Sequence, residues 1–229
     1  MKNSIITKED IEKIRSVSEL NDWIDKKHSQ ISNSKNATES CRLRKGLFKE
    51  FIEESTPLNI FCKQYFTPNP NQLVKQTIGD QNYDAELIDS SDIDFKYIEI
   101  TQAHEGKDDF YRRWHLNEYG HANALGRVVQ NKPIEKSKIK NEAVDHATIV
   151  HNEIQRINRA INKKLDKDYN DKTALVVVCD NTGIAFKDES DIYQLKAHLK
   201  SNFIGKINIF CKVFVVSWNG DLFIELDKL

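Results

Sequence analysis

A run of six apolar residues near the C-terminal end of the chain limits the folds open to it. The run, Ala-Leu-Val-Val-Val-Cys over 174–179, contains no polar residue. Such a segment is typical of a strand that is buried on both faces, because a strand with one solvated face alternates apolar and polar residues. Residues 141–166, upstream of it, carry an apolar stripe at helical spacing and end in basic residues. We therefore expect a mixed α/β fold with this strand inside its sheet.

Two segments further upstream alternate apolar and polar residues as the strands of a hairpin do. In the segment at 97–102, Ile98 and Ile100 alternate with Glu99 and Thr101, so Glu99 points away from the core. In the segment at 83–87, Asp84 lies on the corresponding polar face. The residues between the two segments are mainly Asp and Ser, as expected of a turn. We expect an antiparallel hairpin.

The hairpin brings two isolated carboxylates, Asp84 and Glu99, within reach of one divalent cation. Mg²⁺ prefers few carboxylates, together with water and substrate phosphate oxygens, which matches so sparse a set of ligands. The histidines of the chain, by contrast, match no strong zinc signature, and no cysteine joins them at a ligand spacing. The pair therefore predicts a magnesium site.

The order of these residues resembles the core motif of the PD-(D/E)XK nuclease superfamily, which has the restriction-endonuclease-like fold. The segment Tyr-Ile-Glu-Ile-Thr at 97–101 is similar to the Ile-Glu-Val-Thr version in bacterial members associated with genomic islands and defence loci. The resemblance covers residues 78–226. It implies a mixed central β-sheet flanked by helices in a nuclease-like α/β core at 67–229. Residues 1–66 would then form an N-terminal helical region, whose last helices are able to pack on the core.

The resemblance implies a metal-dependent nuclease that hydrolyses phosphodiester bonds, with DNA as the expected nucleic acid and a bacterial or phage defence system as its setting. Asp84, Glu99 and the Ile100 carbonyl would hold Mg²⁺ or Mn²⁺. In this fold, a helix before the hairpin often adds an acid to the site, and Glu50, Glu53 or Glu54 could supply it. The alternative for each of these acids is a surface role.

Thr101 departs from the family pattern, because it occupies the position of the catalytic lysine. Its hydroxyl could orient water or a phosphate, but it supplies no positive charge to the transition state. Members of the superfamily are known to move this lysine. The candidate replacements in this chain are Gln102, His104, Lys163 and Lys164. Asn82-Tyr83 also stands where the family often has a proline, which is a milder departure.

Nucleic-acid contacts must come from local clusters, because the net charge of the 229-residue chain is −1. Arg112, Arg113 and Trp114 lie in a stretch, 104–126, that we predict to be a long irregular loop. Together they suit phosphate contact and base stacking. Arg159 and Lys164 lie on the predicted long helix. The alternatives are a Trp114 that packs on the core and basic residues that only face solvent. The near-neutral charge also suggests a homodimer or a partner protein.

A non-catalytic protein with the same fold, acting as a nucleic-acid-binding or protein-binding module, is the alternative to an enzyme. An ammonium group of Lys163 or Lys164 close to Glu99 would favour the nuclease. No apolar stretch approaches the length of a membrane span. The four cysteines are scattered, and Cys179 and Cys211 lie in predicted strands as buried thiols. We therefore expect a cytoplasmic protein with no membrane contact.

Overall fold

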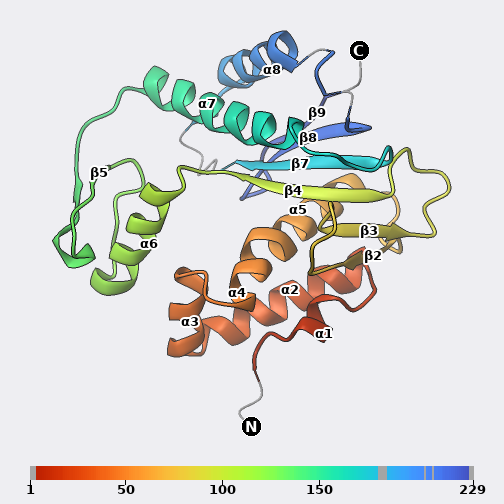
Figure 1. Ribbon diagram of the computed structural model, residues 1–229, viewed down its shortest axis with the longest axis horizontal. Coiled ribbons are helices and arrows are strands. Elements are labelled where there is room, and N and C mark those ends of the chain that lie inside the picture. Colours follow the sequence, from red (N-terminus) through yellow and green to blue (C-terminus); the bar gives the residue numbers. More distant parts are fainter. Residues whose placement is uncertain (1–3, 180–184, 204, 208, 227–229) are drawn as a thin grey trace.

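The fold is a seven-stranded mixed sheet with helices on both faces (Figure 1). The computed structural model describes residues 4–179, 185–203, 205–207 and 209–226. In spatial order the strands are β1 (Arg15–Ser16), β2 (Leu73–Gln76), β3 (Ala85–Ile88), β4 (Tyr97–Ala103), β7 (Thr173–Cys179), β8 (Lys212–Ser217) and β9 (Phe223–Leu226). The helices are α1 (Lys8–Ile11), α2 (Val17–Ser32), α3 (Lys35–Arg42), α4 (Leu47–Glu50), α5 (Thr56–Tyr65), α6 (Lys107–Tyr119), α7 (His146–Leu165) and α8 (Glu189–Phe203).

Strand β7 lies in the interior of the sheet, as its apolar composition predicted. It runs parallel to β4 on one side and to β8 on the other, and all seven of its residues are buried. The remaining neighbours in the sheet are antiparallel. The predicted hairpin is confirmed, since Ala85 pairs with Ile98 and Glu86 pairs with Tyr97. Strand β2, which pairs with β3, was not predicted.

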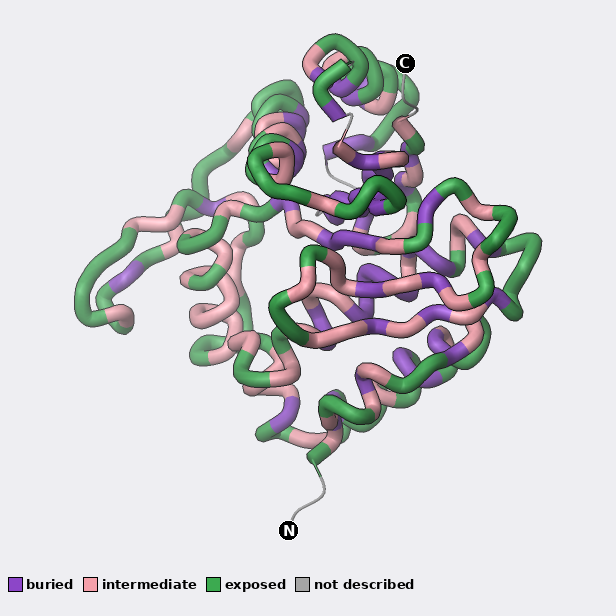
Figure 2. Tube along the Cα trace, turned by 45° about the vertical axis from the view of Figure 1, so that its right-hand side comes forward, coloured by how far each residue is buried: buried purple, intermediate pink, exposed green. Residues whose placement is uncertain are grey.

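The two faces of the sheet pack against different helices. Val176 and Val178 belong to a hydrophobic cluster with residues of α2 and α5, while Leu175 and Val177 belong to a second cluster with residues of α7 and α8. Figure 1 shows α7 and α8 on one side of the sheet and α2 and α5 on the other. The alternation of side chains along a strand thus divides one apolar run between two cores. In Figure 2 the buried parts of the trace follow these strands and the inward sides of the helices.

The N-terminal region contributes to the sheet and to its core. Residues 15–16 form β1, which pairs with β2, so this region is not entirely helical. Phe61 of α5 lies within 4.9 Å of Phe214 of β8, measured between ring centroids. A π-helical turn, Phe51–Ser55, joins α4 to α5. The region at 1–66 therefore packs on the sheet along much of its length.

The prediction of a long irregular loop at 104–126 was wrong, because 107–119 form α6. None of the residues of this helix is buried, so its sequence has no apolar stripe that could have revealed it. Its ends have local signals instead. The Asp109 carboxylate accepts a hydrogen bond from the Glu105 backbone N–H at 2.6 Å, and Gly120 ends the helix with φ 75°. Strands β5 (Arg127–Val129) and β6 (Lys138–Lys140) follow as a separate hairpin.

Strands β8 and β9 form another hairpin of the sheet, across a turn at 218–222. Cys179 is buried at the end of β7, as predicted, whereas Cys211 precedes β8 and is only half-buried. Within the described part of the chain, no helix combines the length and the apolar character needed to cross a bilayer.

Candidate active site

Asp84 lies immediately before β3, at the point where β4 continues beyond the end of its neighbour. Its Oδ2 accepts a hydrogen bond of 2.6 Å from the backbone N–H of Ile100, and its own N–H donates to the Ile98 carbonyl at 2.8 Å. The carboxylate therefore takes the place of the next strand residue beside β4. This arrangement positions Asp84 against Ile100 through the backbone, as the sequence suggested for two members of one site.

Glu99 is buried, with 6% of its surface exposed, although the sequence predicted that it would point away from the core. The alternation along β4 does turn it away from Ile98 and Ile100, which pack on the α5 side. That opposite face is covered by α7, however, so Glu99 is enclosed. The Tyr169 hydroxyl donates a hydrogen bond to Glu99 Oε1 at 3.3 Å.

Lys164, in the last turn of α7, forms an ion pair with Glu99. The side chains of both residues are largely enclosed, with 14% of Lys164 and 8% of Glu99 exposed. A cation thus lies beside Glu99 although position 101 is a threonine. Lys163, the other lysine among the candidates for the catalytic role, lies one position earlier on the helix and is exposed. Thr101 is half-buried on β4.

A third carboxylate, Glu54, approaches this pair from the π-helical turn before α5. The Gln76 side chain donates to its Oε2 at 3.2 Å and in turn accepts from the Ser55 hydroxyl at 2.5 Å. Burial, together with the charges of Glu50 and Glu99, raises the pKa of Glu54 to about 7. Of the three acids that the sequence offered from this helix, Glu54 is the one whose charge is felt at Asp84.

The crowding of carboxylates also affects Asp84. Burial raises its pKa well above the ordinary value, and the charges of Glu99 and Glu54 raise it further; the Ile100 N–H and Lys164 oppose this. Acids that raise each other's pKa form a site where added positive charge is stabilising. Lys164 supplies part of that charge.

An open cleft of about 750 Å³ lies beside these residues. Glu54, Ile100 and Lys164 line it directly, while Asp84 and Glu99 lie behind them. Five basic residues contribute to its wall, namely Lys49, Arg156, Arg159, Lys163 and Lys164. Arg159 and Lys163 are exposed. Four acids, Glu53, Glu54, Glu105 and Asp108, also line the cleft, so its positive charge is concentrated at the exposed Lys49, Arg159 and Lys163, and we refer to it as the basic cleft for these three residues.

Gln102 and His104, two of the predicted substitutes for the lysine, also line the cleft. The Gln102 amide donates a hydrogen bond to the Glu53 carbonyl at 2.8 Å, so the side chain is held toward the π-helical turn. His104 Nδ1 accepts from the Gly106 backbone N–H at 3.0 Å. Lys164 is therefore the candidate that the structure places beside Glu99.

The predicted nucleic-acid-binding residues of α6 differ in their surroundings. Arg112 forms ion pairs with Glu105 at 2.7 Å and with Asp109 at 2.9 Å, so its charge is compensated. Trp114 packs edge-on against Tyr119 of its own helix, at 5.8 Å between ring centroids. Arg113 lines a smaller cavity next to the cleft.

The site offers few metal ligands of its own. Such a set suits Mg²⁺, which keeps water and phosphate oxygens as ligands, better than it suits an ion held entirely by protein groups. Among the described residues, no group of three or more His, Cys, Asp or Glu side chains is arranged to hold a metal ion. Asp84, Glu99 and the Ile100 carbonyl remain as two carboxylates and one carbonyl, and Mg²⁺ is commonly bound through one or two carboxylates with phosphate oxygens and water.

Sequence reasoning did not identify Tyr169 or Gln76 as part of this site. Tyr169 lies in the connection between α7 and β7, where no periodic pattern marks a residue. Gln76 lies on β2, which was not predicted. Gln76 lies two residues after Val74 and shares its buried face, so the period-two position is the signal that could have revealed it.

No protein-family model, curated protein or solved structure matches this chain.

Proposed function

We propose that the protein is a metal-dependent nuclease with a restriction-endonuclease-like core. One observation supports this more than any other: Asp84, Glu99 and Lys164 come together from three separate elements beside a basic cleft. An acid pair that can hold a metal ion, with a cation beside it, is one set of groups able to stabilise the charge that develops in phosphodiester hydrolysis. The antiparallel β2–β3–β4 unit followed by α7 and a parallel β7 is also compatible with that fold.

Asp84, Glu99 and the Ile100 carbonyl would hold Mg²⁺ or Mn²⁺. When bound, such an ion lowers the pKa of water and neutralises charge on a scissile phosphate. Lys164 holds a positive charge at Glu99 Oε1, where the family lysine would otherwise act. Tyr169 donates to the same oxygen and so limits the orientations of the Glu99 carboxylate.

Glu54 gives the site a pH dependence of its own. With a pKa of about 7, it changes charge near neutrality, within reach of Asp84. Its ionised form would strengthen the attraction of the site for a cation. Gln76 holds this carboxylate by one hydrogen bond in either state.

A binding module without catalysis is the second candidate, and one observation favours it. Glu99 is enclosed and already paired with Lys164, so the protein achieves charge balance at this position without a metal ion. In that case the basic cleft would serve to bind nucleic acid, and the acids would only maintain the fold.

Cleavage assays distinguish the two candidates. Duplex DNA, single-stranded DNA and RNA are incubated with the protein and Mg²⁺ or Mn²⁺, and Asp84→Asn and Glu99→Gln are compared with the wild type. We expect cleavage that requires the metal and falls by about 100-fold or more in either folded variant, as for lost ligands of a catalytic ion. Binding without cleavage of any substrate would support the second candidate.

A further inference from the structure

A second cavity, of about 290 Å³, opens beside the basic cleft. The two share four lining residues, namely Glu53, Gln102, His104 and Arg156. Its other walls come from distant parts of the chain, with Arg44 following α3, Arg113 and Leu116 on α6, and Trp218 at the end of β8. The cavity and the basic cleft therefore adjoin, so a ligand bound in the cleft could extend into the cavity.

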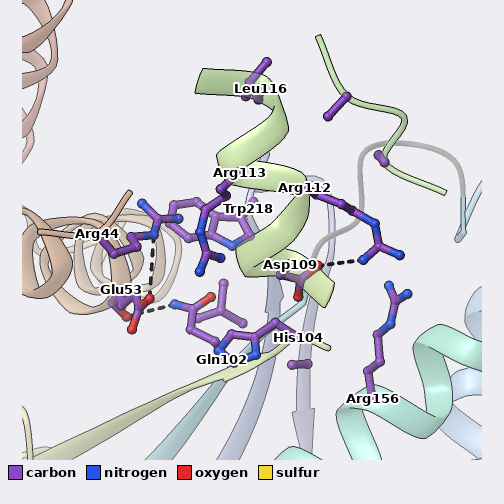
Figure 3. A pocket seen from close by; sticks show the side chains of 14 residues that line it. Arg44, Glu53, Gln102, His104, Asp109, Arg112, Arg113, Leu116, Arg156 and Trp218 are labelled. Atoms are coloured by element: carbon purple, nitrogen blue, oxygen red, sulfur yellow. Dashed lines mark hydrogen bonds and ion pairs between the residues drawn. The ribbon is translucent and has the colours of Figure 1, made fainter. Parts of the chain in front are cut away.

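Two arginines bring positive charge into the cavity from opposite sides. Figure 3 shows Arg113 directing its guanidinium group toward Gln102, while Arg44 enters from the side, with its guanidinium near Trp218 and an ion pair to Glu53. Burial lowers the pKa of Arg44, and the nearby charge of Arg113 lowers it further, while Glu53 opposes both effects. Like charges brought together in this way are stabilised by an anion between them.

The acids of the cavity do not fully compensate these two arginines. Arg44 Nε lies 3.6 Å from Glu53 Oε1, beyond hydrogen-bonding distance, and within the described residues Arg113 forms no ion pair. The Nε atoms of both arginines are buried without a hydrogen-bond partner in the described part of the chain. Arg44 also has φ 55°, a backbone conformation that is unfavourable for its side chain and that tends to persist where it has a use.

The other arginines of the cavity are already neutralised. Arg112 is paired with Glu105 and Asp109, and Arg156 with Glu105 and Glu153. Arg44 keeps one long ion pair, with Glu53 at 3.6 Å, and Arg113 has none among the described residues, so the uncompensated positive charge of the cavity lies mainly at Arg113. It faces an apolar and aromatic wall made by Ala103, Leu116, Ala122, Ala124, Val178 and Trp218. An anionic group next to a flat apolar surface is the chemistry of a nucleotide.

We infer that this cavity binds one unpaired nucleotide of a nucleic-acid strand, with its phosphate between Arg44 and Arg113 and its base against Trp218. The inference rests on the proposed function for the identity of the ligand. The volume lies near the lower limit of ligand pockets and suits a single nucleotide rather than a base pair. The substrate class is therefore a strand with a single-stranded end or a displaced nucleotide.

Binding in EDTA tests the inference without cleavage. Internally labelled single-stranded oligonucleotides carrying a 5′-phosphate, a 3′-phosphate or neither, and a blunt duplex of the same sequence, are titrated by fluorescence anisotropy. We expect tighter binding of the single strands than of the duplex. Arg113→Gln should weaken single-strand binding about 10- to 100-fold, the range for a lost charged hydrogen bond. Arg44→Gln provides a second variant in case the first does not fold.

Arg42→Gln is the matched control, because Arg42 is an exposed arginine on α3 that does not line the cavity. A preference for one phosphorylated end that Arg113→Gln removes identifies a terminal phosphate as the ligand. Equal weakening of all three single strands identifies an internal phosphate. Equal losses in Arg42→Gln and Arg113→Gln, or no single-strand binding by the wild type, would overturn the inference.

The outcomes also separate this inference from the proposed nuclease. If single-strand binding depends on Arg113 but the protein cleaves no substrate, the role of the cavity is supported and the proposed catalytic function is contradicted. If Arg113→Gln and the wild type cleave at the same rate and with the same end preference, the proposed nuclease is supported and this role of the cavity is contradicted.

Discussion

Lys164 of α7 pairs with Glu99 of β4, a residue 65 positions earlier in the chain. The long helix crosses the face of the sheet so that its last turn reaches β4. A lysine from a helix therefore lies beside Glu99, although the residue two positions after Glu99 is Thr101.

Lys164→Gln should destabilise the fold by about 3 kcal/mol, because it leaves the enclosed Glu99 carboxylate without its partner. Lys163→Gln is the control, since it removes the same charge from an exposed position on the same helix and should change stability by less than about 0.5 kcal/mol. Urea unfolding measures both. Adding Glu99→Gln to Lys164→Gln should recover part of the loss, and equal effects of the two lysine variants would contradict the assignment.

The same pair of lysine variants should differ in catalysis. Removing one group that stabilises developing charge typically costs 10²- to 10³-fold in rate, so about 100-fold slower cleavage is expected for Lys164→Gln. Lys163→Gln should retain most of the activity at low salt. Single-turnover cleavage rates with saturating Mg²⁺ would reveal the difference, and an active Lys164→Gln protein would remove Lys164 from the mechanism.

Glu54→Gln should change how stability depends on pH. The pKa of Glu54 is raised from 4.5 to about 7 in the folded protein, so its contribution to stability is fully present below pH 4.5 and is lost as the pH rises through 7. The free energy of unfolding of the wild type, relative to that of the variant, should therefore decrease as the pH rises from 4.5 to 7. Urea titrations across this range measure the difference, and parallel curves would show that Glu54 is not perturbed.

Mg²⁺ should raise the unfolding temperature of the wild type more strongly as the pH increases through 7. A ligand that binds only the folded state stabilises it, and protons on Glu54 and Asp84 compete with the cation. Differential scanning fluorimetry at several Mg²⁺ concentrations measures the shift. Asp84→Asn should abolish it, whereas a shift that persists in this variant would place the ion elsewhere.

Glu105, just before the N-terminus of α6, pairs with Arg112 and Arg156, and these ion pairs should stabilise the folded protein. Glu105 accepts from Arg112 and Arg156, and these partners outweigh burial to lower its pKa. Glu105→Gln should therefore cost about 2 kcal/mol, between the values for exposed and buried pairs. Glu39→Gln breaks the exposed pair with Lys45, which water screens, and should destabilise the protein much less. Thermal unfolding of both variants provides the comparison, and equal costs would contradict it.

The structure brings Asp84 and Glu99 together as their alternation and spacing predicted. Local patterns were sufficient there, because each strand and its turn carry their own signals. They failed for α6, whose residues are not buried and whose position depends on ion pairs with Glu105 and on its capping groups. Glu99 was expected on a polar face, and the packing of α7 made that face an interior one.

Apolar periodicity was enough to predict the buried strand β7, the hairpin of β3 and β4 and the long helix α7, since burial requires apolar residues at a fixed period. The two acids of the hairpin were also predicted. That Lys164 rather than Lys163 reaches Glu99, that the charge of Glu54 is felt at Asp84, and that Arg44 lies near Arg113 depended on the packing of distant segments. These choices depend on how helices lie across the sheet, and adjacent lysines on a helix differ by about 100° in direction, which composition and spacing do not reveal.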